Sequence, residues 1–168
     1  ANYFSSLGIT RGDRVMLVCK RHYQFWFSIL GLHKLGAIAI PATNQLVEKD
    51  FVYRFQAADV NAIVCTADGD VAHQVELAEK TAGMELTKIL VNGSREGWHD
   101  FDNEYHFFSR RWIRTKDAPC GSDPMLMLFT SGTTGYPKMA MHSYKYALGH
   151  FVTAKYWHMC ERDGLHFT

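Results

Sequence analysis

Four short apolar segments constrain the fold of this chain more strongly than any other feature. They occupy residues 15–20, 37–41, 61–66 and 87–93. Each is apolar at consecutive positions, which is typical of strands that are buried on both faces. The stretches between them have the length and spacing of helices. This alternation predicts an α/β fold in which helices cover both faces of a parallel sheet, with right-handed connections.

The first two expected helices differ in how clearly they begin and end. Residues 23–36 are apolar nearly all round, so we expect a buried helix that ends at Gly36. Gly31 inside it costs about 1 kcal/mol relative to alanine, which is tolerable if another backbone packs closely there. The helix expected at residues 48–59 lacks a good cap, because Val47 cannot accept a hydrogen bond through its side chain.

Further along the chain, the helical signal varies in strength. Residues 70–83 carry an apolar stripe and end at Gly83. A weaker aromatic helix is expected around residues 100–112. In residues 144–159 aromatic side chains recur at helical intervals, which is more typical of core or helix packing than of a cofactor site.

Composition excludes several classes of protein. The chain has 168 residues, of which 47% are apolar and 21% charged, as expected for one globular domain. Its 18 Lys and Arg against 17 Asp and Glu argue against a nucleic-acid partner, whose phosphates require a basic face. The balance gives no support for an anionic membrane surface either. The most apolar helix, residues 25–35, is too short to span a bilayer.

The cysteines and histidines do not form a metal-ligand pattern. Cys19, Cys65, Cys120 and Cys160 are widely spaced, without a C-x-x-C pair, and indicate reduced, buried thiols of a cytosolic protein. The nine histidines are scattered as well, and no H-E-x-x-H occurs. We therefore expect no metal site built by the protein alone.

The segment with the clearest chemistry is LFTSGTTGYPKMAMH, residues 128–142, directly after a strand expected at residues 124–129. Gly132 and Gly135 allow backbone conformations in which successive N–H groups converge on one point. Lys138 adds a positive charge with three donors. Four hydroxyl groups add further donors: Thr130, Ser131, Thr133 and Thr134. Together these groups suit phosphate oxygens better than a carboxylate.

Three other interpretations compete for a segment of this composition. The Walker loop, G-x-x-x-x-G-K-[ST], is excluded. Pro137 would stand in place of its last glycine, and Met139 in place of the hydroxyl residue that binds magnesium. A dinucleotide fingerprint is excluded, because no G-x-G-x-x-G follows the first strand. Clusters of Ser, Thr and Gly are also ordinary turn chemistry. The ordered positions, with proline and lysine at a fixed distance after an apolar strand, favour phosphate binding.

The segment resembles the hallmark [ST]-S-G-[ST]-T-G-x-P-K of the adenylate-forming (AMP-binding) superfamily. The matching positions are Thr130, Ser131, Gly132, Thr133, Thr134, Gly135, Pro137 and Lys138. Met139 departs from the usual glycine, and PKMAMHSY is similar to the short- and medium-chain acyl-CoA synthetase branch. Residues 7–66 are similar to the first subdomain of that branch, so the resemblance covers essentially the whole chain.

The resemblance implies an AMP-forming acid–thiol ligase that uses ATP, a carboxylic acid and coenzyme A, with Mg²⁺ assisting. It assigns the β- and γ-phosphates to the loop and a catalytic role to Lys138. His142 matches a position close to the active-site cleft, although a packing histidine at a strand end explains it about as well. Acyl chain length and oligomeric state stay open.

The resemblance also implies how the chain is divided. We expect the N-terminal portion of an adenylation domain in residues 1–168, with an α/β subdomain in residues 1–113. A polar loop, residues 114–123, leads to the strand, phosphate-binding loop and helix of residues 124–168. Because the chain begins without Met and ends in what looks like a strand, we expect a fragment that is inactive alone.

Two consequences and one rival follow from the fragment hypothesis. A truncated surface favours self-association. The expected location of the whole protein is the cytoplasm, or the mitochondrial matrix for a eukaryotic source. The rival hypothesis is a self-contained, non-catalytic α/β module that binds a nucleotide or another anion.

Overall fold

The computed structural model of the chain describes residues 1–131, 135–161 and 163–164. Within these residues, seven strands form one sheet in the order β5-β4-β3-β1-β2-β6-β7. The strands are β1 (Arg14–Val18), β2 (Ile38–Pro41), β3 (Ala62–Thr66), β4 (Thr87–Val91), β5 (His99–Asp100), β6 (Pro124–Thr130) and β7 (Lys138–Ser143). The helices are α1 (Asn2–Ser6), α2 (Gln24–Leu35), α3 (Glu48–Ala58), α4 (Val71–Ala82), α5 (Phe101–Glu104) and α6 (Lys145–Tyr156), with a short 3₁₀ helix at Tyr105–Phe107.

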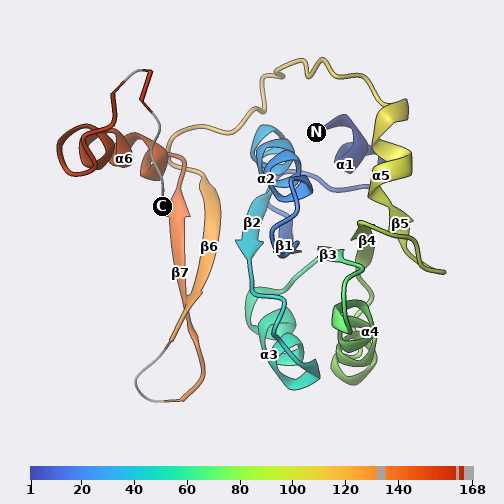
Figure 1. Ribbon diagram of the computed structural model, residues 1–168. Coiled ribbons are helices and arrows are strands. Elements are labelled where there is room, and N and C mark those ends of the chain that lie inside the picture. Colours follow the sequence, from blue (N-terminus) through green and yellow to red (C-terminus); the bar gives the residue numbers. More distant parts are fainter. Residues whose placement is uncertain (132–134, 162, 165–168) are drawn as a thin grey trace.

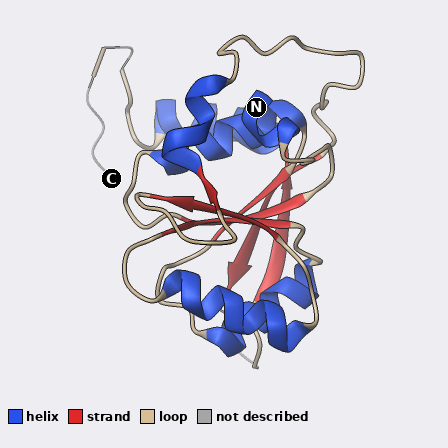
Figure 2. Ribbon diagram, turned by 90° about the vertical axis from the view of Figure 1, so that its right-hand side faces the viewer, coloured by secondary structure: helices blue, strands red, loops and turns tan. Residues whose placement is uncertain are grey.

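The α/β architecture expected from the sequence is confirmed. All neighbouring strands are parallel except β6 and β7, which form an antiparallel hairpin at one edge. Helices α1, α2 and α5 pack on one face of the sheet, and α3 and α4 pack on the other. Figure 2 shows these two helical layers on either side of the strands.

Burial on both faces explains why the strands are apolar without interruption. In β1, Val15 and Leu17 face the layer of α1 and α2, whereas Met16 and Val18 face the layer of α3 and α4. All four are at most 1% exposed. Such a strand cannot alternate apolar with polar residues, because neither side meets water.

The expectation of a fully buried α2 is wrong. The helix packs on the sheet through small and medium side chains, among them Ser28 and Leu32, and its outer face is open. Trp26, Phe27 and Leu30 are 64%, 50% and 59% exposed. Apolar composition all round the helix therefore does not mean that the described residues cover it all round.

The two glycines of α2 behave as the sequence predicts. Gly36 ends the helix in the left-handed conformation, with φ of +83°. At Gly31, a Cβ atom would lie 3.1 Å from the backbone nitrogen of Ala1 and 3.1 Å from the ring of Phe4. The missing side chain lets α1 pack directly against α2.

The start of α3 is better satisfied than its sequence indicates. Val47 has no capping side chain, but its N–H donates to the Asp50 carboxylate at 3.3 Å. The Glu48 N–H donates to Oε1 of Gln74 in α4, at 2.8 Å. A neighbouring helix thus supplies the acceptor that the residue before the helix lacks.

Residues 99–112 differ from the single aromatic helix expected there. A two-residue strand, β5, comes first, α5 ends at Glu104, and the 3₁₀ helix ends at Phe107. Asp100 caps α5 by accepting from the Asn103 N–H at 3.1 Å. The aromatic rings of this stretch pack against α1, which the sequence did not predict as a helix. The segment is therefore a set of short turns held by ring contacts.

The polar segment of residues 114–123, which precedes β6, is bonded to Arg11 near the start of the chain. The Arg11 guanidinium donates to the Asp117 carbonyl at 3.0 Å and pairs with Asp123 at 2.6 Å. Because β6 adds to β2, residues on both sides of this segment share one sheet. The division into residues 1–113, 114–123 and 124–168 stays a prediction.

Two smaller expectations concern the thiols and the membrane. Cys19 and Cys65 are free and buried, as expected, and burial raises the pKa of Cys19 to about 12. Cys120 and Cys160 are free but exposed, so the expectation of buried thiols is wrong for these two. Among the residues that the structure describes, no helix has the length and apolarity needed to cross a bilayer.

We predict that Gln74→Ala lowers the free energy of unfolding by about 1 kcal/mol, because it removes the acceptor at the start of α3. Urea denaturation followed by circular dichroism measures the change. Gln56→Ala, at an exposed position of α3, is the matched control and should change stability by less than about 0.5 kcal/mol. Equal effects of the two substitutions would contradict the capping role.

Candidate functional site

The glycine-rich segment connects β6 to β7 of the antiparallel hairpin. Thr130 and Lys138 are register partners at the end of the hairpin. The Thr130 hydroxyl donates to the Lys138 carbonyl at 3.3 Å and closes the neck of the turn. Figure 1 shows the hairpin beside β2, with its turn at the end away from α6. The expected site therefore lies at the tip of a hairpin, between two antiparallel strands.

The described part of the turn contains Thr130, Ser131, Gly135 and Lys138. All four are exposed. Gly135 has a φ of +118°, which confirms that this position uses a backbone conformation closed to other residues. Gly132, Thr133 and Thr134, which complete the predicted set, lie outside the described residues. Two hydroxyls, one glycine and the lysine are thus brought to one turn.

Lys138 begins β7. It forms no ion pair with any residue that the structure describes. An exposed ammonium group is available to an anionic ligand. The strand fixes the backbone from which this side chain extends.

His142 lies at the opposite end of β7 from Lys138. Side chains four residues apart share a face of a strand, and their Cα atoms are about 14 Å apart at about 3.4 Å per residue. The imidazole of His142 contacts the Tyr146 ring of α6, with centroids 4.1 Å apart. The structure therefore does not group His142 with the turn, and its role stays a prediction.

The hairpin is mounted on α2 at its base. Tyr144, which follows β7, donates its hydroxyl proton to the His33 carbonyl at 2.5 Å. The two rings also meet edge to face, 5.9 Å apart. Burial raises the pKa of Tyr144 to about 12 and lowers the pKa of His33. Both side chains consequently stay neutral at this junction at neutral pH.

The tip of the hairpin is held by α3, a contact that the sequence did not predict. The Tyr53 hydroxyl donates to the Pro137 carbonyl at 2.8 Å. The rings of Tyr53 and Tyr136 are stacked, 4.7 Å apart and 20° from parallel. In the sequence, the only available signal was an aromatic residue beside the buried stripe of α3. A half-exposed tyrosine at such a position is common in helices that contact no functional loop, so the signal was too weak to use.

A metal ion at this turn would be coordinated mainly by atoms of the bound ligand and less by side chains of the protein. The described residues contain no group of three His, Cys, Asp or Glu side chains able to hold one. Mg²⁺ needs few protein ligands when phosphate oxygens and water complete its octahedron. The Thr130 and Ser131 hydroxyls are therefore compatible with Mg²⁺ that arrives with a phosphate.

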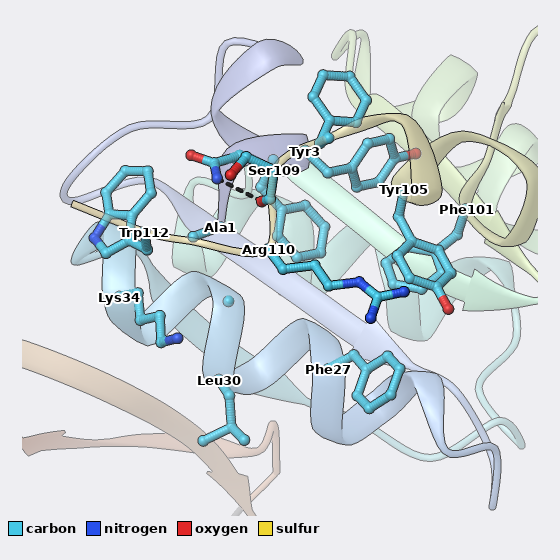
Figure 3. A pocket seen from close by; sticks show the side chains of 14 residues that line it. Ala1, Tyr3, Phe27, Leu30, Lys34, Phe101, Tyr105, Ser109, Arg110 and Trp112 are labelled. Atoms are coloured by element: carbon cyan, nitrogen blue, oxygen red, sulfur yellow. Dashed lines mark hydrogen bonds between the residues drawn. The ribbon is translucent and has the colours of Figure 1, made fainter.

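The hollow drawn in Figure 3 lies on the other face of the sheet from α3. It has a volume of about 560 Å³ and is bounded by α1, α2, α5 and residues 108–112. Its walls are mainly aromatic, with the cationic side chains of Lys34 and Arg110 at the rim. No residue of the glycine-rich turn contributes to it, so it is separate from the candidate site.

Comparison with known proteins shows the family of the chain. The family model for AMP-binding enzymes matches residues 1–167. The human mitochondrial acyl-coenzyme A synthetase ACSM1 is 39% identical over 149 residues, which are 88% of this chain and 25% of that protein. Human mitochondrial ACSM3 is 33% identical over 161 residues, which are 94% of this chain and 27% of that protein.

Solved structures show the same fold. The anthranilate CoA ligase AuaEII, in complex with anthranoyl-AMP, superposes with a TM-score of 0.80 at 22% identity, over 94% of this chain and 29% of that one. A Brucella canis acyl-CoA synthetase gives 0.81 at 23% identity, over 98% of this chain and 29% of that one. The chain spans about a quarter of the length of its curated relatives. Because the family model matches residues 1–167, the chain belongs to the family of AMP-binding enzymes.

Proposed function

We propose that this chain is the part of an ATP-dependent acyl-CoA synthetase that binds the β- and γ-phosphates of ATP. One observation carries the proposal. The hairpin of β6 and β7 pairs Thr130 with Lys138, so that the first and last residues of the hallmark segment lie together at an exposed end of the hairpin. The names of the curated relatives supply the substrate class, an acid activated as its coenzyme A thioester.

The proposed reaction has two steps. A carboxylate oxygen attacks the α-phosphorus of ATP, the bond to the bridging oxygen breaks, and pyrophosphate leaves from an acyl-adenylate. The coenzyme A thiolate then attacks the acyl carbon and displaces AMP. In the first step negative charge grows on the leaving pyrophosphate, and the turn is suited to stabilise it.

Each described group of the turn has a part in that step. Lys138 supplies a positive charge to the β- and γ-phosphate oxygens. The Ser131 hydroxyl donates a hydrogen bond, the Thr130 hydroxyl does so by turning its proton from the Lys138 carbonyl to a phosphate oxygen, and Gly135 allows the backbone to approach. Mg²⁺, when bound with ATP, neutralises further phosphate charge. Thr133, Thr134 and Gly132 belong to the same proposal on sequence grounds.

The remaining assignments are part of the proposal too. The partners are ATP, coenzyme A and a small carboxylic acid, whose chain length stays open. The location is the cytoplasm, or the mitochondrial matrix if the source is eukaryotic, as the names of the curated relatives favour. The rival function, a self-contained non-catalytic anion-binding module, predicts the same turn but no adenylate.

We predict that Lys138→Ala, in the full-length protein that carries this chain, lowers the rate of acyl-adenylate formation about 100-fold. The reason is the loss of one preorganised charge from the developing pyrophosphate. ATP–pyrophosphate exchange measures the step. Lys155→Ala, which removes an exposed lysine from α6, is the matched control and should leave the rate unchanged. An undiminished rate in Lys138→Ala would refute the role of the turn.

We predict that the 168-residue chain alone catalyses no ATP–pyrophosphate exchange with acetate, butyrate or octanoate. The chain spans about a quarter of the length of its curated relatives, which are named acyl-coenzyme A synthetases. The full-length protein, assayed with the same acids, is the positive control. Exchange by the isolated chain above the Lys138→Ala background would overturn this expectation.

We predict that the isolated chain self-associates through α6. Leu148, Phe151 and Val152 of that helix are 65%, 72% and 63% exposed, so the described residues leave much apolar surface in water. Sedimentation velocity should show oligomers that Phe151→Glu dissociates. Phe107→Glu, at another exposed phenylalanine, is the control and should leave them intact. A monomeric chain at high micromolar concentration would disprove self-association.

A further inference from the structure

We propose that Tyr53 and Arg54, consecutive residues of α3, are positioning residues for the glycine-rich turn. They hold the two arms of the hairpin tip and thereby fix the backbone from which Lys138 reaches its ligand. The proposal deepens the function proposed above and rests on it. Neither residue belongs to the hallmark segment.

Tyr53 touches both arms of the turn with one side chain. On the arm that enters the turn, its ring meets Phe129 edge to face, with centroids 6.2 Å apart. On the arm that leaves it, the ring stacks on Tyr136 and the hydroxyl donates to the Pro137 carbonyl at 2.8 Å. One side chain therefore spans the neck from outside the hairpin.

The hydrogen bond to Pro137 acts directly on Lys138. The Pro137 carbonyl and the Lys138 nitrogen belong to the same planar peptide group. Proline has its φ restrained by its ring, so the unit has little freedom of its own. When Tyr53 fixes this plane, it fixes the direction in which β7 and the Lys138 side chain begin.

Arg54 secures the entering arm. Its guanidinium carbon lies 5.2 Å from the centre of the Phe129 ring, the geometry of a cation–π contact. One guanidinium nitrogen also donates to the Asp50 carbonyl, one turn earlier in α3, at 3.0 Å. The guanidinium is thus held by its own helix while it covers the last part of β6.

The platform for these contacts is rigid. On the opposite side of α3, Phe51 and Phe55 are fully buried against the sheet. The helix start is capped by Gln74 of α4. The helix therefore gives Tyr53 and Arg54 a fixed base from which to hold the tip.

We therefore expect substitutions of Tyr53 or Arg54 to slow the first half-reaction, adenylate formation, and to leave the second half-reaction unchanged. Adenylate formation requires the turn to meet the triphosphate, whereas thioester formation from preformed acyl-adenylate does not. A residue needed only for folding would impair both half-reactions equally. The two half-reactions therefore separate positioning from general stability.

The experiment uses the full-length protein with the acid, among acetate, butyrate and octanoate, that the unaltered enzyme adenylates fastest. Tyr53→Phe keeps the ring contacts and loses the hydrogen bond, and should lower kcat/KM for ATP about 5- to 10-fold. Tyr53→Leu loses both and should lower it at least 30-fold, and Arg54→Met should fall between these values. Gln56→Ala, on the exposed side of α3, is the control and should match the unaltered enzyme.

The second measurement starts from synthetic acyl-adenylate and coenzyme A. Thioester formation should proceed within 2-fold of the unaltered rate in all three variants. Positioning is refuted if the Tyr53 variants keep the unaltered kcat/KM for ATP, or if both half-reactions fall in parallel. Failure of the proposed function looks different, because the unaltered enzyme would then make no acyl-adenylate.

Hydrogen exchange on the isolated chain tests the geometry without any substrate. In Tyr53→Leu, the amides of Tyr136 and Lys138 should exchange at least 10-fold faster, while those of β1 and β3 stay unchanged. Gln56→Ala again serves as the control. Unchanged exchange at both amides would show that Tyr53 does not hold the turn, whatever the function of the turn is.

Discussion

The pairing of β6 with β2 is the interaction on which the candidate site depends. It rests on one register pair, Ala39 with Leu126, supported by the burial of Met125 and Met127 between the helical layers. β6 joins a sheet whose inner strands are fixed by burial on both faces. Its partner β7, in contrast, has an exposed outer edge. The hairpin therefore carries the turn out from a rigid sheet, and its position must be secured by further contacts at each end.

Those contacts come from opposite helical layers. Tyr144 joins the base of the hairpin to α2 through the His33 carbonyl. Tyr53 and Arg54 join its tip to α3. The described residues cover little of the remaining hairpin surface, as the exposed methionines 139 and 141 of β7 show. The side-chain contacts that join the hairpin to the helices thus lie near the two ends of β7, where they determine the direction of the strand.

The sequence predicted what local pattern determines and missed what depends on tertiary contact. The four inner strands follow from uninterrupted apolar runs, and Gly36 and Gly83 end helices because only a left-handed conformation fits there. The covering of α2 could not be predicted, since apolar composition does not tell which neighbour is present. Gln74 as the cap of α3 and Tyr53 as a partner of Pro137 lie 26 and 84 positions from the residues they bind. No local periodicity links such residues, so only the fold identifies them.

A loop that binds the phosphates of a nucleotide has two physical requirements that oppose each other. Its donors must be fixed where charge develops in the transition state, because preorganised dipoles need no reorganisation during the reaction. It must also open to admit and release a nucleotide. In the proposed function, the hairpin tip serves the first requirement through α3. The peptide of Pro137 and Lys138 is held by Tyr53, and Gly135, two residues earlier, has a φ of +118° that other residues rarely adopt. The proposed function therefore places the charge of Lys138 on the held side of the tip, next to β7.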